Sequence, residues 1–394
     1  MLAGAAALIL MMTAAAGAEL SLRESTKGGK VIRKTWVDEG GQTVSGPEGY
    51  AYTTYSYSGT SATEKYFDAG DMPFRTAGGY YGRIMTYGNR HRLEEIVYLD
   101  ENGEKAPCAA GYTRVKMSYT SKGQVTSVLY YDENGKLMIV PALGYAAIRA
   151  EYRGTALTSR TYLDENRNPV DTPLGYASVI QGVNKSNQVL SIRFEHADGS
   201  PAACAEGWAS CRREVDKKNR EISVKYYDLG GKLVDRGAGY AYEVKTYESD
   251  RAYTVSRFDT ADARIAMGDG YVSVRREFNK DELLVKESWL DAEGKPTEAA
   301  DGTAAVSYAY DGQGRLKQVS FLDLSGQPVL NRAGTAGYQE NLDDNGRILS
   351  RVFLGKGGKP GNTAEGYSEI RYLYAADGSV SKTEYYDVNG VLVK

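Results

Sequence analysis

The sequence predicts an all-β protein, an elongated array of about 11 stacked β-hairpin repeats of ~32 residues each. Two motifs predict it: a Gly-aromatic pair that recurs at a nearly constant interval, and an Asp-containing turn ahead of each pair. Composition agrees, because 32 Tyr and 45 Gly with only 10 Pro favour strands joined by tight turns. The sequence leaves open whether the strands form a β-solenoid or an open twisted antiparallel sheet.

A glycine followed by an aromatic residue marks each repeat. Successive marks lie 30 to 33 residues apart, which is too regular to arise by chance. Gly302-Thr303 and Gly334-Thr335 keep the spacing but lack the ring. The complete pairs are Gly49-Tyr50, Gly79-Tyr80, Gly111-Tyr112, Gly144-Tyr145, Gly175-Tyr176, Gly207-Trp208, Gly239-Tyr240, Gly270-Tyr271 and Gly366-Tyr367.

A second motif precedes each glycine by about 11 residues: an aromatic residue, one intervening residue, then Asp, usually with Gly three positions later. In such a turn Asp accepts backbone N–H bonds and Gly takes a positive φ. His196 and Gly355 replace the Asp, as expected where the side chain only caps a turn. The aromatic column is predicted to stack in the core, with Arg257 as its one exception; its rings are Trp36, Tyr66, Tyr98, Tyr130, Tyr162, Phe194, Tyr226, Trp289, Phe321, Phe353 and Tyr385.

Each repeat is predicted to contain two hairpin-type turns and two or three short strands. In one repeat a strand over 112–119 leads to a turn at 121–123, and a second strand returns from Val125 to Tyr131. A short third segment, such as Lys295-Pro296, leads on to the next Gly-aromatic pair. Because an isolated hairpin is marginal in water, neighbouring repeats must share their buried surface.

The predicted domains are a signal peptide over residues 1–18 and the β-repeat array over residues 19–394. The apolar run from Leu8 to Met12 leads to Ala16-Gly17-Ala18, small residues that are typical of a signal-peptidase site, although no Lys or Arg precedes the run. A short membrane anchor is the alternative. The segment predicts a protein that is secreted or displayed at the cell surface, and no later run is apolar enough to span a membrane.

Charge and cysteine usage exclude several kinds of partner. Lys and Arg number 48 against 51 Asp and Glu, so the chain has no basic field for nucleic acid. Cys108, Cys204 and Cys211 lack metal-ligand spacing, and no cofactor or metal is expected. Cys204 and Cys211 could pair as a disulfide, or all three cysteines could serve as small apolar core residues.

The sequence predicts no catalytic site. His91 and His196, the only histidines, lie more than a hundred residues apart, and no nucleophile elbow, metal-protease helix or phosphate loop is present. Asp100-Glu101-Asn102-Gly103 brings carboxylates together, but it does not continue as a calcium-binding loop. The turn aspartates recur as equivalents, whereas an active site is a single constellation of residues.

Extra tyrosines in the N-terminal third are the candidate binding residues. They exceed what one buried face requires, and if exposed they would form a ribbon of rigid rings for stacking on sugars or packing against a protein. The alternative is that they pack across strands in the core. The candidates are Tyr50, Tyr52, Tyr55, Tyr57, Tyr80 and Tyr81.

Two repeat families resemble this chain. Residues 308–316, Tyr-Ala-Tyr-Asp-Gly-Gln-Gly-Arg-Leu, resemble the Tyr-Asp (YD) repeat of bacterial RHS-type proteins, which implies strands wound into a β shell. Residues 130–136, followed by Gly144-Tyr145, are similar to the wall-binding repeats of Gram-positive surface proteins, which implies stacked hairpins. The resemblance to either family implies an architecture and no binding residues, and Trp36, Trp208 and Trp289 are too few to build repeated choline cages.

The leading hypothesis is an exported, non-enzymatic repeat protein that binds cell-wall glycan or a protein partner at the cell surface. The first alternative is a structural spacer or shell segment without a specific ligand. The second is a glycan-active enzyme that uses carboxylates. Unpaired edge strands would also allow self-association.

Overall fold

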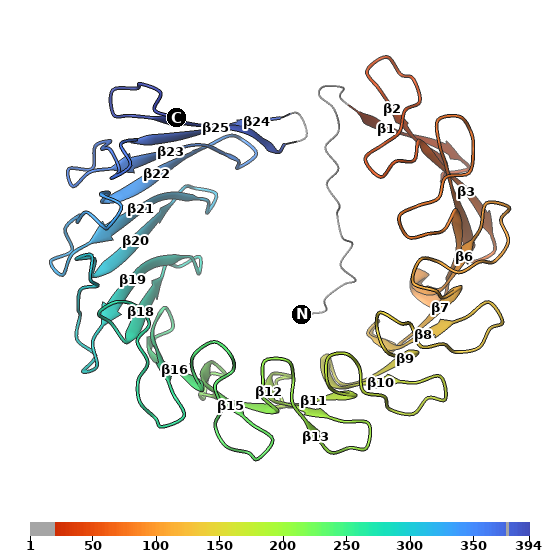
Figure 1. Ribbon diagram of the computed structural model, residues 1–394, viewed down its shortest axis with the longest axis horizontal. Coiled ribbons are helices and arrows are strands. Elements are labelled where there is room, and N and C mark those ends of the chain that lie inside the picture. Colours follow the sequence, from red (N-terminus) through yellow and green to blue (C-terminus); the bar gives the residue numbers. More distant parts are fainter. Residues whose placement is uncertain (1–19, 376–377) are drawn as a thin grey trace. The chain divides into compact units, whose positions relative to one another are not determined.

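The computed structural model describes residues 20–375 and 378–394, and nearly all of their regular structure is β (Figure 1). The predicted signal peptide, residues 1–18, lies outside the described residues. The chain divides into two compact units, residues 1–173 and 174–394, called unit 1 and unit 2 below. No helix in the described part is long and apolar enough to cross a membrane.

In its described residues unit 1 contains ten strands and one short 3₁₀ turn, η1 (Asn89–His91). The strands are β1 (Ser21–Lys27), β2 (Lys30–Val37), β3 (Tyr52–Ser58), β4 (Ser61–Phe67), β5 (Gly82–Tyr87), β6 (Leu93–Leu99), β7 (Arg114–Tyr119), β8 (Val125–Tyr131), β9 (Ala147–Arg153) and β10 (Ala156–Leu163).

The described part of unit 2 contains fifteen strands. They are β11 (Ser178–Val183), β12 (Val189–Glu195), β13 (Pro201–Ala202), β14 (Ser210–Val215), β15 (Glu221–Tyr227), β16 (Tyr242–Ser249), β17 (Ala252–Phe258), β18 (Ser273–Phe278), β19 (Leu284–Leu290), β20 (Ala305–Tyr310), β21 (Leu316–Leu322), β22 (Gly337–Leu342), β23 (Ile348–Leu354), β24 (Glu369–Tyr374) and β25 (Val380–Tyr386).

Within each unit the strands pair antiparallel with their neighbours in the chain, so the predicted array of β-hairpins is confirmed. In the hairpin β7–β8 six residue pairs run from Arg114↔Tyr131 to Tyr119↔Val125. The next pairing, β8–β9, uses only three, from Ser127↔Arg149 to Leu129↔Ala147. Of the two architectures that the sequence left open, each unit adopts the antiparallel sheet. The predicted third segment forms a single bridge in most repeats, such as Leu290↔Pro296, and a two-residue strand only at β13.

The Asp-x-x-Gly turns form as predicted. The Asp68 carboxylate accepts the N–H groups of Gly70 and Met72 at 2.8 and 2.9 Å, and Asp164 repeats the pattern. Gly135 adopts a φ of 79° in the equivalent turn of its own repeat. Gly355 keeps the turn without a carboxylate through its backbone bond to the carbonyl of Lys359. The motif therefore sets the backbone path after each second strand.

The predicted aromatic stack exists, and the rings of the Gly-aromatic pairs insert between its members. Each such ring reaches the sheet from the loop that precedes its strand, so the two columns merge into one ring ladder. In unit 1 successive ring centroids lie 4.8–6.2 Å apart; the rings are Tyr50, Tyr66, Tyr80, Tyr98, Tyr112, Tyr130, Tyr145 and Tyr162.

In unit 2 the ring ladder is divided into segments. The first joins Tyr176, Phe194, Trp208 and Tyr226, with centroids 4.5–5.3 Å apart. A second joins Tyr271 and Trp289 at 4.7 Å. The last joins Tyr338, Phe353, Tyr367 and Tyr385. Within the described residues Phe321 contacts no other aromatic ring, because Thr303 and Thr335 stand where its neighbouring rings would be.

A second row of tyrosines ties neighbouring hairpins together at the opposite end of the strands. Each lies near the end of the first strand of a hairpin and donates its hydroxyl to the carbonyl that begins the second strand of the preceding hairpin. Tyr310 Oη, for example, lies 2.7 Å from the Leu284 carbonyl oxygen. We call these contacts tyrosine clasps; their donors are Tyr57, Tyr119, Tyr152, Tyr247, Tyr310 and Tyr374.

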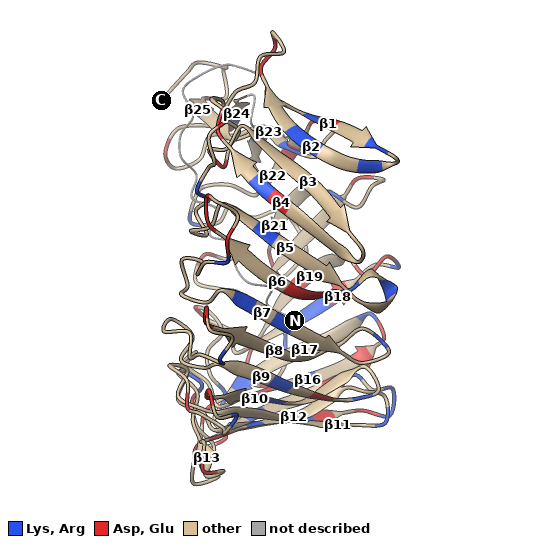
Figure 2. Ribbon diagram, turned by 90° about the vertical axis from the view of Figure 1, so that its right-hand side faces the viewer, with Lys and Arg blue, Asp and Glu red and all other residues tan. Residues whose placement is uncertain are grey.

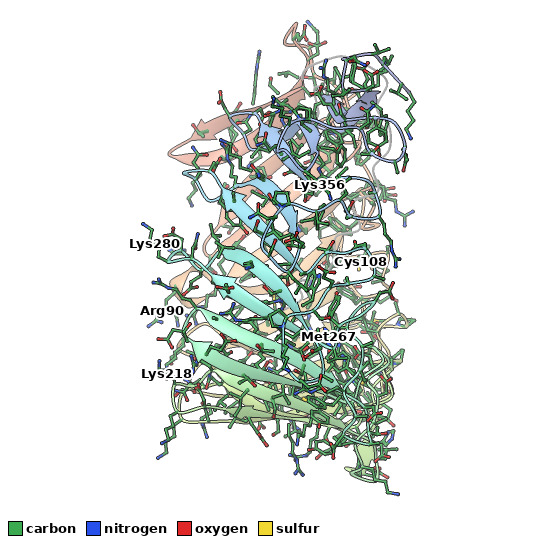
Figure 3. The ribbon with its side chains drawn as sticks, turned by 90° about the vertical axis from the view of Figure 1, so that its left-hand side faces the viewer. Arg90, Cys108, Lys218, Met267, Lys280 and Lys356 are labelled. Atoms are coloured by element: carbon green, nitrogen blue, oxygen red, sulfur yellow. The ribbon has the colours of Figure 1, made fainter. Side chains whose placement is uncertain are left out.

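Because side chains alternate along a strand, each sheet has a second face that carries no ring ladder. We call it the polar face. Charged side chains of both signs are distributed over strands and turns and do not gather in one band (Figure 2). In unit 2 Lys218 and Lys280 lie at the hairpin-turn edge, while Met267 and Lys356 lie at the loop edge (Figure 3).

Candidate functional site

The six candidate tyrosines do not form an exposed ribbon. Tyr50 and Tyr80 are half-buried members of the ring ladder. The expectation of exposure is wrong for Tyr52, which is 5% exposed, stacks on Phe67 at 4.8 Å and donates its hydroxyl to Asp71. The physical reason is that each ring lies beside another side chain from the neighbouring strand or loop.

Tyr55, Tyr57 and Tyr81 also have structural contacts. Tyr55 is half-buried and donates to Glu64 at 2.7 Å. Tyr81 is half-buried, and its backbone continues the sheet through a bond to the Leu99 carbonyl. Tyr57 alone of the six is exposed, at 41%, yet it makes a clasp to Val31. The structure thus gives the side chains of Tyr55 and Tyr57, and the backbone of Tyr81, a structural contact.

Glu64 is a buried carboxylate that the sequence did not single out. It accepts hydrogen bonds from Tyr55 Oη, Tyr66 Oη and Arg83 Nε at 2.7, 2.8 and 2.6 Å. Burial raises the pKa of Tyr66 well above its usual range, and the charge of Glu64 adds to the effect. With its oxygens bonded to three donors, Glu64 holds β3, β4 and β5 together. Two features of Glu64 indicate this role: it stands two residues before Tyr66, a ring of the column, and it lies opposite Arg83 in the strand register.

The remaining sequence candidates also have local structural roles. His196 forms a turn through its backbone, with its N–H bonded to the Ser200 carbonyl. Cys108, Cys204 and Cys211 are all free thiols, so Cys204 and Cys211 do not pair here. In residues 20–375 and 378–394 no group of three or more His, Cys, Asp or Glu side chains is arranged to hold a metal ion.

The repeats differ from one another at the middle of the polar face. At the middle of the strands the cross-strand pair is Ile84↔Val97 in one hairpin, Arg212↔Lys225 in another and Ser307↔Ser320 in a third. At the ring ladder, by contrast, almost every repeat supplies an aromatic side chain. Residues that repeat build the fold, so the varied face is the better candidate for recognition.

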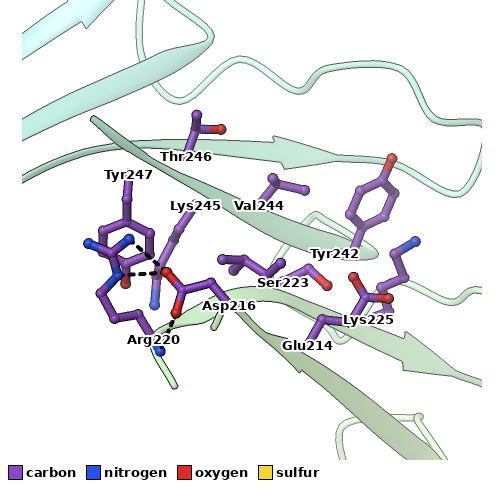
Figure 4. Close-up of a pocket in the computed structure, with 11 residues that line it drawn as sticks. Glu214, Asp216, Arg220, Ser223, Lys225, Tyr242, Val244, Lys245, Thr246 and Tyr247 are labelled. Carbon is purple, nitrogen blue, oxygen red and sulfur yellow. Dashed lines mark hydrogen bonds and ion pairs between the residues drawn. The ribbon is translucent and has the colours of Figure 1, made fainter. Parts of the chain in front are cut away.

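A groove of about 570 Å³ lies over β14, β15 and β16 of unit 2 and is lined by side chains of both faces, with Glu214, Ser223 and Lys225 on the polar face (Figure 4). Its size falls within the range of about 300–1,000 Å³ that is usual for small-ligand sites. The lining residues are Glu214, Asp216, Arg220, Ile222, Ser223, Lys225, Tyr242, Val244, Lys245, Thr246 and Tyr247.

At one end of the groove the charged side chains form ion pairs within the protein. Arg220 binds Asp216 at 2.7 Å and lies 4.0 Å from the centre of the Tyr247 ring. The backbone N–H of Arg220 and its guanidinium hold the pKa of Asp216 below its usual range. Lys245 binds Glu221 at 2.8 Å; burial opposes its charge, but the bond to Glu221 and the negative charges of Glu221 and Glu243 together raise its pKa. These charges are therefore engaged before any ligand arrives.

At the other end of the groove the charged side chains are not paired in the part of the chain that the structure describes. Glu214 lies opposite Ser223 in the β14–β15 register, and Lys225 lies two residues further along the same face. Neither Glu214 nor Lys225 makes an ion pair within the described residues, although Lys225 Nζ lies 5.1 Å from the centre of the Tyr242 ring. Burial and the bond to Asp262 raise the pKa of Tyr242 to about 12, so its phenol is neutral at ordinary pH.

The groove could not be found from the repeated motifs, because Glu214 and Lys225 belong to neither of them. Ser223, Glu214 and Lys225 stand out only when the strand register shows which side chains share a face. Side chains alternate between the two faces of a strand, so the three-residue separation of Ser223 and Tyr226 places them on opposite faces. This is the one indication of the position of Ser223 that the sequence contains.

Comparison with known proteins identifies no family. No protein-family model matches the chain, and no curated protein matches it. A crystal structure of TcdB2-TccC3-TEV matches with a TM-score of 0.34 and 10% identity over 93% of this chain and 19% of that chain. A structure of the Photorhabdus luminescens Tc holotoxin pore, with a mutated TccC3, gives 0.31 and 11% over 91% and 19%. This chain spans about a fifth of the length of those chains, and similarity at this level carries no argument about function.

Proposed function

We propose that the chain is an exported, non-enzymatic repeat module that binds cell-wall glycan through its polar face. The observation that carries the proposal is the contrast between the two faces of the sheet. The ring ladder and the clasps repeat, and they use the aromatic and turn residues for contacts between hairpins. The middle of the polar face varies from hairpin to hairpin, as expected of a surface that recognises a ligand.

The distribution of polar groups supports a glycan ligand. The polar face carries amide and hydroxyl groups at neighbouring positions, such as Gln339 Nε2, which donates to Gln318 Oε1 at 2.9 Å, and Asn341 Nδ2, which donates to Ser350 Oγ at 2.8 Å. Such groups can exchange hydrogen bonds with sugar hydroxyls without a net charge. Export rests on the apolar N-terminal segment ending at Ala18.

The second candidate function is a structural spacer or shell segment without a specific ligand. The tyrosine clasps favour it, because they join successive hairpins in both units at the same position. Side chains also link adjacent hairpin turns: Gln188 Nε2 lies 2.6 Å from the Asn219 carbonyl oxygen, and Arg92 Nη1 lies 2.7 Å from that of Thr120. A protein built to hold its form along the array would use such contacts.

Co-sedimentation of the whole chain with purified cell-wall polysaccharide separates the two functions. We expect retention that falls about tenfold in the double variant Arg149→Ser/Arg212→Ser, which removes two exposed cations from the polar face. The matched control is Lys185→Ser/Lys280→Ser, which removes two exposed cations at hairpin turns and should leave retention unchanged. Absence of retention for the unmodified chain would overturn glycan binding and favour the spacer.

A further inference from the structure

The inference concerns the floor of the groove on the polar face of unit 2, and it rests on the proposed function. Ser223 is 6% exposed, and its Oγ has no hydrogen-bond partner. Among the described residues three other buried hydroxyls lack a partner, those of Thr113, Thr303 and Thr363, and all three lie outside the groove. A buried hydroxyl without a partner is unfavourable, so its retention in a groove points to a group that reaches it from outside.

Comparable hydroxyls elsewhere on the same face are satisfied within the protein. Ser256 Oγ and Ser273 Oγ lie 2.7 Å apart, and Ser350 Oγ accepts a hydrogen bond from Asn341. Ser223 has Glu214 and Val244 as its cross-strand neighbours, and neither bonds to it. Ser223 therefore differs from these serines in lying in the groove with no partner for its hydroxyl.

The side chains around Ser223 define what kind of ligand fits. Glu214 can accept two hydrogen bonds and Lys225 can donate them, while the other charges of the groove are paired with one another. Figure 4 shows Glu214, Lys225 and Tyr242 together at the end of the groove away from Arg220. A ligand of either charge would meet one like charge here, whereas a neutral ligand with adjacent hydroxyls would satisfy both groups.

We propose that this end of the groove binds a neutral saccharide. Adjacent sugar hydroxyls donate to the Glu214 carboxylate, Lys225 donates to a hydroxyl or ring oxygen, and Ser223 Oγ bonds a third hydroxyl. The flanking Glu214 and Lys225 side chains turn outward to expose the hydroxyl. Charged sugars bind less tightly, because the opposed charges of Glu214 and Lys225 leave no net field for them.

Saturation-transfer NMR on the full chain, with chitotriose and maltotriose as probes, tests the inference. We expect a signal from at least one probe, reduced about tenfold in affinity by Glu214→Gln or Lys225→Met and severalfold by Ser223→Ala. These changes are small in volume, and thermal unfolding of each variant checks that the fold is kept. The control Ser127→Ala changes the equivalent strand position of β8, outside the groove, and should bind as the unmodified chain does.

The possible outcomes separate a failure of the groove inference from a failure of the proposed function. Unchanged binding in all three groove variants would overturn the groove inference while the proposed function stands. Loss with Glu214→Gln and Lys225→Met but not with Ser223→Ala would overturn the role assigned to Ser223. No signal from either probe, with the chain still retained on wall polysaccharide, would overturn the saccharide assignment alone. Failure of both measurements would overturn the inference and the function together.

Discussion

In unit 1 the ring ladder runs unbroken from Tyr50 to Tyr162, whereas in unit 2 it is interrupted around Arg257, Thr303 and Thr335. The hairpins are nevertheless paired in the same way: six residue pairs join β7 to β8 in unit 1 and β20 to β21 in unit 2. The difference teaches that turns and strand register specify the repeat. The ladder adds packing energy to a backbone arrangement that persists where rings are missing.

The largest expected effect comes from removing a ring in the unbroken ladder. Tyr98 is 9% exposed and contacts Tyr80 and Tyr112 at 4.8 and 5.7 Å, so Tyr98→Ala should lower the local stability of its hairpin by about 3–5 kcal/mol. Phe321→Ala should cost at least about 1 kcal/mol less, because Phe321 has no ring neighbours to lose. Hydrogen exchange of the affected strands measures both. Equal losses would show that the ring contacts contribute nothing beyond burial.

The second effect concerns the interruption at Arg257. Its guanidinium lies 4.6 Å from the centre of the Tyr240 ring, and its Nε lies 3.2 Å from Glu243, so a cation replaces the missing ring. Arg257→Ala should cost about 1–2 kcal/mol through loss of both contacts. Arg257→Tyr should cost less than half as much, because the column regains a ring. Thermal unfolding of the two variants compares them, and equal costs would mean that the ion pair, not stacking, holds this position.

Much of this arrangement could be predicted from residues alone. The Gly-aromatic interval and the Asp turns gave the repeat, its strands and the aromatic column, because each depends on local backbone chemistry. The interleaving of Tyr80 between Tyr66 and Tyr98 could not be predicted, because it depends on how a loop returns over the sheet. The burial of Tyr52 and the groove around Ser223 depend on cross-strand register, which a single sequence does not provide.

A third, smaller effect should be the same in both units. Tyr152→Phe in unit 1 and Tyr310→Phe in unit 2 each remove one clasp, to Val125 and to Leu284, and each should cost about 0.5–1.5 kcal/mol. The control is Tyr87→Phe, whose hydroxyl has only a 3.7 Å contact with the Met85 sulfur and should matter little. Denaturation midpoints provide the comparison. A clear difference between the two clasp variants would show that the units differ in more than their ladders.

The smallest effect is a change in the pKa of a buried tyrosine, which leaves the packing unchanged. Burial raises the pKa of Tyr145 to about 12, and the neighbouring Tyr130 and Tyr162 add to it; burial and the bond to Asp262 do the same for Tyr242. Both folded pKa values exceed the ordinary value of 10.0, so their stabilisation is complete below pH 10 and is lost as the pH rises toward about 12.

Asp262→Asn separates the two causes. It removes the negative charge beside Tyr242 and should lower the pKa of that phenol toward 10, while Tyr145, held by its neighbouring rings, should titrate as before. Phenolate absorbance, recorded with Tyr242→Phe and Tyr145→Phe as references for each signal, follows both groups. A shift at Tyr145 would mean that the charge acts at long range. No shift at Tyr242 would mean that burial alone keeps its phenol neutral.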